Sequence, residues 1–230
     1  GLARLGWMRE QGLCCAVDPA AAYALYLRAA DRNSGLAQGR LGRLAEAGVF
    51  SAADDAAALA WYQLGAKNGD ALSMRQLGIF LEQGRAVEPD AKAAVKWYLR
   101  AARKGDRVAM ACLAWCYETG VGASRDERSA ARWYEAAANA GSAFAMRRLG
   151  VMCEQGVYYE VDYAAAFAWY EKGAALGDAV CLCRLGWMYE HGVYVDVHPA
   201  LAHDYYLRAA ELGYPFAQYC VEWDLAHGVE

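Results

Sequence analysis

Residues 71–106 read ALSMRQLGIFLEQGRAVEPDAKAAVKWYLRAARKGD, and the fold can be predicted from this segment. Its first half is apolar mostly at helical spacing, and Gly84 follows where a left-handed residue would end a helix. Asp90 stands where an N-cap carboxylate would start a second helix, which Gly105 would end. The stretch therefore predicts two antiparallel helices, here named helix A and helix B, joined by a tight loop.

The same pattern recurs every 36 residues without insertion or deletion. Helix A carries a ladder of leucines with valine in the last place: Leu5, Leu41, Leu77, Leu113, Leu149, Leu185 and Val221. Helix B carries a matching ladder of tyrosines: Tyr26, Tyr62, Tyr98, Tyr134, Tyr170 and Tyr206. A fixed period of this length is typical of a stacked array, in which each unit buries its apolar face against its neighbours. We expect an all-α, right-handed α-α superhelix (solenoid), one repeat domain over residues 1–230 with six repeats and a partial seventh.

Composition excludes several classes of function. The net charge of −4 gives no case for nucleic acid or for an anionic membrane, and no apolar run approaches the roughly 18 residues that span a bilayer. The eight cysteines mostly ignore the 36-residue period, so we expect free thiols rather than a disulfide framework. Free thiols favour a cytoplasmic location, with a periplasmic or secreted one left open.

No catalytic motif is evident. The chain has no P-loop and no HExxH, and none of its serines is followed three residues later by lysine. Cys112 with Cys116, and Cys181 with Cys183, lack the partners that would complete a four-ligand zinc site. We expect no enzyme activity, no metal and no cofactor.

The fifth repeat carries the full motif of a known family: Ala145, Leu149-Gly150, Met152, Gly156, Asp162, Ala166, Trp169-Tyr170, Gly173-Ala174 and Gly177. This motif resembles the Sel-1-like repeat (SLR) family, a relative of the tetratricopeptide arrays, and the resemblance covers essentially the whole chain. It implies an α-solenoid with helix A on its concave side, and a role as an adaptor or scaffold. The positions that are cross-linked in the cysteine-rich members hold no cysteine here, for example Ala66 and Met74.

Function in an array should lie where the repeat varies. Two positions of helix A, two before and two after the ladder leucine, are four residues apart and so share a face. This face and its border carry Trp7, Arg40, Arg43, Arg75, Ile79, Trp115, Arg147, Arg184, Trp187 and Trp223. Because Trp and Arg most often dominate interface energetics, we predict that these residues bind another protein, as an extended segment or a helix with acidic and aromatic or apolar character. The alternative is that the tryptophans only pack between adjacent helix A elements.

Two further hypotheses stay open. The first is that the chain is a structural module that self-associates through open ends. The second concerns a carboxylate that recurs near the end of helix A: Glu10, Glu46, Glu82, Glu118, Glu154 and Glu190. A helix C-terminus is electrostatically poor for an anion. We therefore expect a local hydrogen bond to compensate, with a role in ligand binding as the other interpretation.

Overall fold

A computed structural model describes residues 1–13 and 16–227, and in these residues it contains α-helices and no strand. The helix A elements are α1 (Leu2–Gln11), α3 (Gly35–Glu46), α5 (Ala71–Gln83), α7 (Arg107–Thr119), α9 (Ala143–Gln155), α11 (Ala179–His191) and α13 (Pro215–His227). The helix B elements are α2 (Pro19–Ala30), α4 (Asp55–Lys67), α6 (Ala91–Ala102), α8 (Glu127–Asn139), α10 (Tyr163–Ala175) and α12 (Pro199–Glu211). The predicted alternation of helices A and B is confirmed.

The N-terminal caps lie where the sequence predicts them, whereas α6 ends at Ala102, before the predicted Gly105, which follows in the turn with a φ of 88°. Asp54 and Asp90 each accept a hydrogen bond of 2.9 Å from the backbone N–H three residues on, and so cap α4 and α6. His198 replaces the aspartate in the last repeat, and its Nδ1 accepts from the N–H of Leu201 at 3.1 Å. Gly84 ends α5 with a φ of 69°, in the left-handed region that favours glycine.

A close approach between helices A and B holds each repeat together. All six ladder tyrosines are at most 2% exposed. The glycine that follows the ladder leucine lies directly against the tyrosine ring: a Cβ on Gly42 would be 2.5 Å from the ring of Tyr62. The expectation that these glycines permit close backbone approach is confirmed. Because the ring is locked over the helix A backbone, the tyrosine fixes how helix B crosses helix A.

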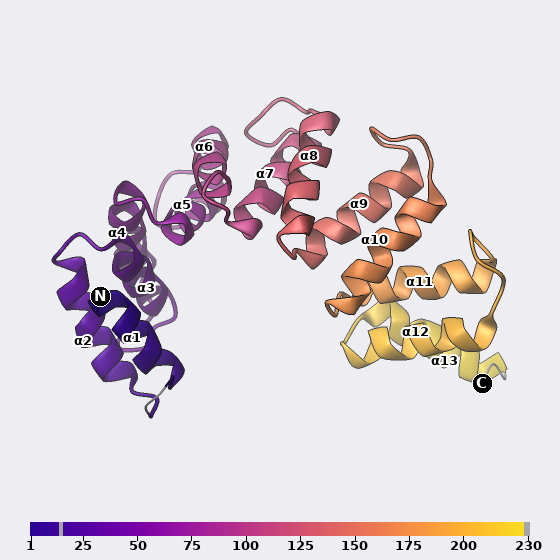
Figure 1. Cartoon of the computed structure of the whole chain (residues 1–230), viewed down its shortest axis with the longest axis horizontal. Coiled ribbons are helices and arrows are strands. Elements are labelled where there is room, and N and C mark those ends of the chain that lie inside the picture. The colour runs from indigo at the N-terminus through magenta and orange to yellow at the C-terminus, as the bar shows by residue number, and fades with distance from the viewer. Residues whose placement is uncertain (14–15, 228–230) are drawn as a thin grey trace. The chain divides into compact units, whose positions relative to one another are not determined.

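The described residues form two compact units, Gly1–Arg125 and Asp126–Glu230. In each unit, consecutive helices lie side by side (Figure 1). The core of each unit combines ladder tyrosines and leucines with alanines such as Ala22 and Ala166. Leu5 differs from the other ladder leucines, because α1 packs mainly on α2 and leaves this side chain 45% exposed. A single repeat domain over residues 1–230 stays a prediction.

Candidate functional site

The variable face of helix A is partly exposed in both units. In the first unit, Trp7 and Trp115 are 38% and 40% exposed, Arg43 is exposed and Ile79 is half-buried. In the second unit, the corresponding Trp187 is half-buried, and Trp223 is 45% exposed. Large aromatic side chains that keep this much surface in contact with solvent are available to a partner.

Two of the predicted arginines connect consecutive helix A elements. The Nε atom of Arg75 lies 3.2 Å from Asp106, the carboxylate that caps α7. A guanidinium nitrogen of Arg147 lies 3.7 Å from Asp178, which caps α11 in the same way. Both arginines are therefore partly neutralised within the fold.

The border arginines have a similar structural role. Arg40 and Arg184 each approach a ladder glutamate of the preceding repeat at 3.6 Å, Glu10 and Glu154 respectively. Gln76 takes the corresponding position in the third repeat and donates a hydrogen bond of 3.2 Å to Glu46. This position thus links the second, third and sixth repeats to the one before.

The recurring glutamate of helix A is explained by the tyrosine ladder. Each of five ladder tyrosines donates its hydroxyl proton to the glutamate sixteen residues earlier, for example Tyr98 to Glu82 at 2.5 Å and Tyr206 to Glu190 at 2.6 Å. Burial, followed by this hydrogen bond, raises the pKa of each of these tyrosines well above its usual value. The hydroxyl therefore remains a donor, and the glutamate has the local hydrogen bond that the sequence led us to expect.

The variable face of the second unit is hollowed between α11 and α13. A groove of about 270 Å³ is lined by aromatic side chains from both helices, among them Trp187, Phe216, Tyr219 and Trp223. His191 stacks on Trp187 with 4.8 Å between the ring centroids. A second hollow of about 320 Å³ shares Trp187 and Phe216 with the first. The two hollows together offer an aromatic surface whose lining also includes the polar side chains of Glu190, His191 and Asp224, the usual mixed composition of a binding site.

One set of residues on the variable face of helix A was not predicted from the sequence. The position five before the ladder leucine is apolar in the second to the seventh repeat, and four of these side chains are clearly exposed: Leu36, Val108, Phe144 and Phe216. An apolar residue at a fixed period is usually core, so only the exposed fraction identifies this position as surface. The guanidinium of Arg147 lies 5.2 Å from the ring of Phe144, so charge and apolar surface adjoin here.

The cysteines do not form a reactive site in the described residues. Burial raises the pKa of Cys112 to about 11 and that of Cys116 and Cys183 to about 12, so these thiols stay protonated. The six described cysteines are free, while Cys14 and Cys15 lie outside the described residues. Within the described ranges, no group of three or more His, Cys, Asp or Glu is arranged to hold a metal ion. Over the same ranges, no helix has the length and apolar character needed to cross a membrane.

The Sel1 repeat family model matches this chain six times, over residues 1–34, 35–70, 71–106, 108–142, 143–178 and 179–214. The chain therefore belongs to the Sel1 repeat family. It is an all-helical solenoid related to the tetratricopeptide arrays, and Sel1 repeat proteins are typically non-enzymatic scaffolds that mediate protein interactions.

Two solved structures are similar over nearly the whole chain. One is c5321, a protective antigen of uropathogenic Escherichia coli with an SLR fold: it is 27% identical, with a TM-score of 0.82 over 97% of this chain and 48% of that one. The other is a Sel1 repeat protein from Oxalobacter formigenes, 28% identical, with a TM-score of 0.83 over 96% of this chain and 64% of that one. The chain thus spans about half and just under two thirds of these relatives. None of the curated proteins matches it.

Proposed function

We propose that this chain is a non-enzymatic scaffold that binds another protein on the exposed face of its helix A elements. The ligand is an extended segment or a helix of the partner. The observation that carries the proposal is the aromatic groove between α11 and α13, where Phe216, Tyr219 and Trp223 are 53%, 62% and 45% exposed. Monomeric proteins rarely expose large apolar side chains in a contiguous group unless another surface covers them.

The residue types support the same conclusion. Aromatic anchors in a hollow supply most of the energy at interfaces, and the polar rim supplies orientation. Here the apolar anchors are Trp187 and Phe216, and the polar side chains of His191 and Arg184 also line the hollows. In the first unit, Trp115 and Arg43 occupy the same repeat position as Trp187, so the helix A elements there carry a corresponding face of their own.

The first test removes the anchors from the intact chain. Trp187→Ala combined with Trp223→Ala should weaken a captured partner by about 2 kcal/mol or more, because aromatic anchors dominate such interfaces. Leu207→Ala is the matched control, since Leu207 is a similarly exposed side chain on α12, a helix B of the same unit. The measurement is partner recovery from extracts by quantitative mass spectrometry, together with helicity by circular dichroism.

Unchanged recovery by a folded double variant would contradict the proposal. Loss of helicity in the double variant would assign the tryptophans to the core, which is the alternative the sequence left open. Sedimentation over a wide concentration range examines the rival hypothesis of self-association. The scaffold proposal expects a constant sedimentation coefficient, and a rise that the two tryptophan substitutions abolish would favour the rival.

A further inference from the structure

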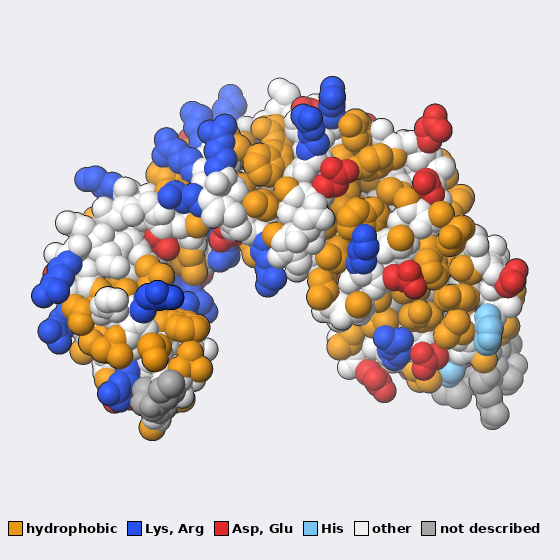
Figure 2. All heavy atoms as spheres, viewed as in Figure 1, with side chains coloured by type: hydrophobic (Ala, Val, Ile, Leu, Met, Phe, Trp, Pro, Cys, Tyr) orange, Lys and Arg blue, Asp and Glu red, His pale blue; other side chains and the backbone are white. Residues whose placement is uncertain are grey.

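The helix B of the third repeat, α6, carries a strip of positive charge on its outer face. Its members are exposed side chains within and just after the helix: Lys92, Lys96, Arg100, Arg103 and Lys104. At ~100° and 1.5 Å per residue they fall within an arc of about 120° and a length of about 18 Å. Figure 2 shows Lys and Arg side chains gathered over this helix.

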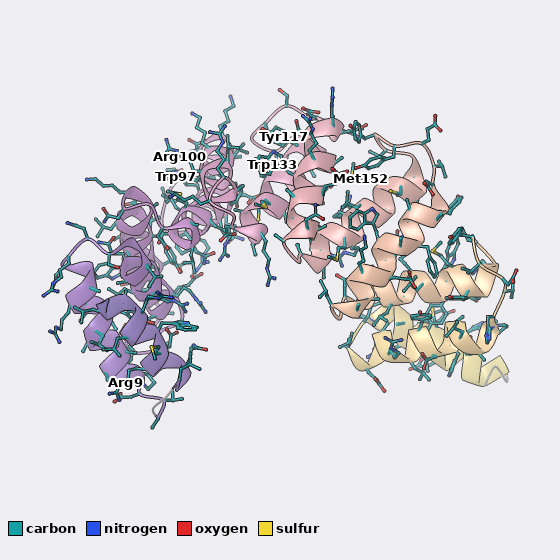
Figure 3. All side chains as sticks on the ribbon, in the orientation of Figure 1. Arg9, Trp97, Arg100, Tyr117, Trp133 and Met152 are labelled. Atoms are coloured by element: carbon teal, nitrogen blue, oxygen red, sulfur yellow. The ribbon has the colours of Figure 1, made fainter. Side chains whose placement is uncertain are left out.

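The strip has no acidic partner among the residues that the structure describes. Across the described ranges, no acidic group lies within ion-pair distance of these five side chains, whereas Arg75 and Arg85 of the same unit are both paired. The guanidinium of Arg100 instead lies 4.5 Å from the ring of Trp97 on the same helix (Figure 3). This contact holds Arg100 in place without neutralising its charge.

The repeat itself supplies a comparison. The positions of Lys92 and Lys96 hold alanine in the second repeat, as Ala56 and Ala60, and in the first and fifth repeats as well. Only the fourth repeat also has basic residues at both, Arg128 and Arg132. Alanine is therefore compatible with this fold at both positions.

The lysines also oppose helix stability. Lys92 is in the first turn of α6, where the helix dipole disfavours a positive charge and where no acidic residue is present. Lys92 with Lys96, and Lys96 with Arg100, are like charges at i and i+4, a spacing at which they repel. Lys92 and Lys96 destabilise the helix, and other repeats fold with alanine in their places. Their presence therefore indicates a role other than folding.

Charge is unevenly divided along the chain. Residues 1–125 contain 16 Lys and Arg against 12 Asp and Glu, a net charge of +4, while residues 126–230 contain 7 against 15, a net charge of −8. The five cations of the strip exceed the whole positive excess of the first unit. The strip therefore lies in the unit of positive net charge, where its five cations would attract a negatively charged partner.

We propose that the outer face of α6 binds an acidic, extended segment of a partner protein. Basic side chains four residues apart on a helix are separated by about 6 Å along its axis. Side chains on one face of an extended strand are separated by roughly 6.6 Å. Carboxylates at every second residue of the segment can therefore meet Lys92, Lys96 and Arg100 in register.

The chemistry of the helix favours a peptide over other polyanions. None of the exposed large hydrophobic residues lies on α6, so the strip lacks the apolar side chains that insert into a membrane surface. Trp97 is half-buried and carries Arg100 on its ring, so it offers no platform on which a base could stack. The site is on a helix B and is independent of the face proposed above for helix A.

The test uses the full chain and a labelled peptide of alternating Glu and Thr, with a Gln and Thr peptide as the neutral comparison. Lys92→Ala combined with Lys96→Ala should weaken binding of the acidic peptide roughly threefold to tenfold at physiological ionic strength, as expected for exposed charge pairs. The midpoint of thermal unfolding should stay unchanged or rise, because alanine favours the helix. A merely structural role for the lysines would lower it.

Arg28→Ala combined with Arg32→Ala is the matched control. It removes the same charge from the same unit, at and just beyond the end of α2, and should leave peptide affinity unchanged. Equal weakening in the control would overturn the proposal, as would equal affinity of the wild-type chain for the two peptides. Tighter binding of single-stranded DNA or of phosphatidylserine vesicles through the same lysines would overturn it too.

Discussion

Glu46 connects three helices of the first unit. It accepts hydrogen bonds from the hydroxyl of Tyr62 at 2.7 Å and the amide of Gln76 at 3.2 Å, and it pairs with Arg85 at 2.7 Å. Burial alone would raise its pKa, but the hydrogen bonds from Tyr62 and Arg85 outweigh this effect and hold the pKa below its ordinary value. The carboxylate therefore remains charged in the fold, and it stabilises the junction between the second and third repeats.

Glu46→Gln should reduce the free energy of unfolding by about 1–2 kcal/mol at neutral pH, since hydrogen bonds to a charged group are lost in a half-buried site. A lowered pKa in the folded state contributes stability above the unfolded pKa, and this contribution is lost as pH falls through the folded pKa. The difference from wild type should therefore shrink in acid. Urea unfolding at neutral and acidic pH measures it, with Glu88→Gln, an exposed loop carboxylate, as the control. A difference that is the same at both pH values would contradict this role.

Residue roles were only partly predictable from the sequence. The glutamate and tyrosine ladders are both visible in it, but their sixteen-residue separation reveals no contact until the helix crossing places the end of helix A beside helix B. For the same reason, Arg75 and Arg147 could be placed on a face but not paired with Asp106 and Asp178. Those pairs connect one helix A to the N-terminal cap of the next helix A and depend on how the repeats stack.

At the scale of the helix, local signals sufficed. Asp90 and Gly84 mark the start of α6 and the end of α5 by their own chemistry, so these two boundaries could be predicted from the sequence. A second left-handed loop position was missed, because it is occupied by Ala86, Tyr158 and Tyr194. Among these loops, the fourth repeat alone has glycine at this position, Gly122, and glycine is the residue that usually indicates a positive φ.

Gly78→Ala tests the crossing of α5 and α6. The added Cβ would lie 2.5 Å from the ring of Tyr98, so the ring must shift out of its buried site. We expect a loss of about 1–3 kcal/mol from overpacking, larger than the gain of about 1 kcal/mol that alanine brings to a helix interior. Denaturant unfolding measures the effect. Gln83→Ala, an exposed change in the same helix, should be neutral or stabilising, and a stabilising Gly78→Ala would show that the crossing is loosely packed.

At the scale of the whole molecule, the 36-residue period predicts the structure of each repeat. It does not predict how many repeats unfold together as one cooperative unit. The described residues divide into two compact units at Arg125 and Asp126, and the 36-residue ladder crosses this point without a break. Ala114 replaces the usual glycine in the helix A just before it. We propose that residues 1–230 nevertheless behave as a single repeat domain, because the stability of an array combines repeat terms with nearest-neighbour interface terms.

Separating the chain into residues 1–125 and 126–230 tests this proposal. In one cooperative array each fragment loses a nearest-neighbour term, so both should unfold at lower denaturant concentration than the intact chain. Hydrogen exchange resolved by peptide should show α7 and α8 losing the most protection in the fragments, while α3 and α11, farther from the cut in sequence, change least. Mixing the two fragments should restore part of that protection. Fragments that keep the unfolding midpoints of the intact chain, with unchanged exchange in α7 and α8, would instead establish two independent domains joined in sequence by an unbroken repeat.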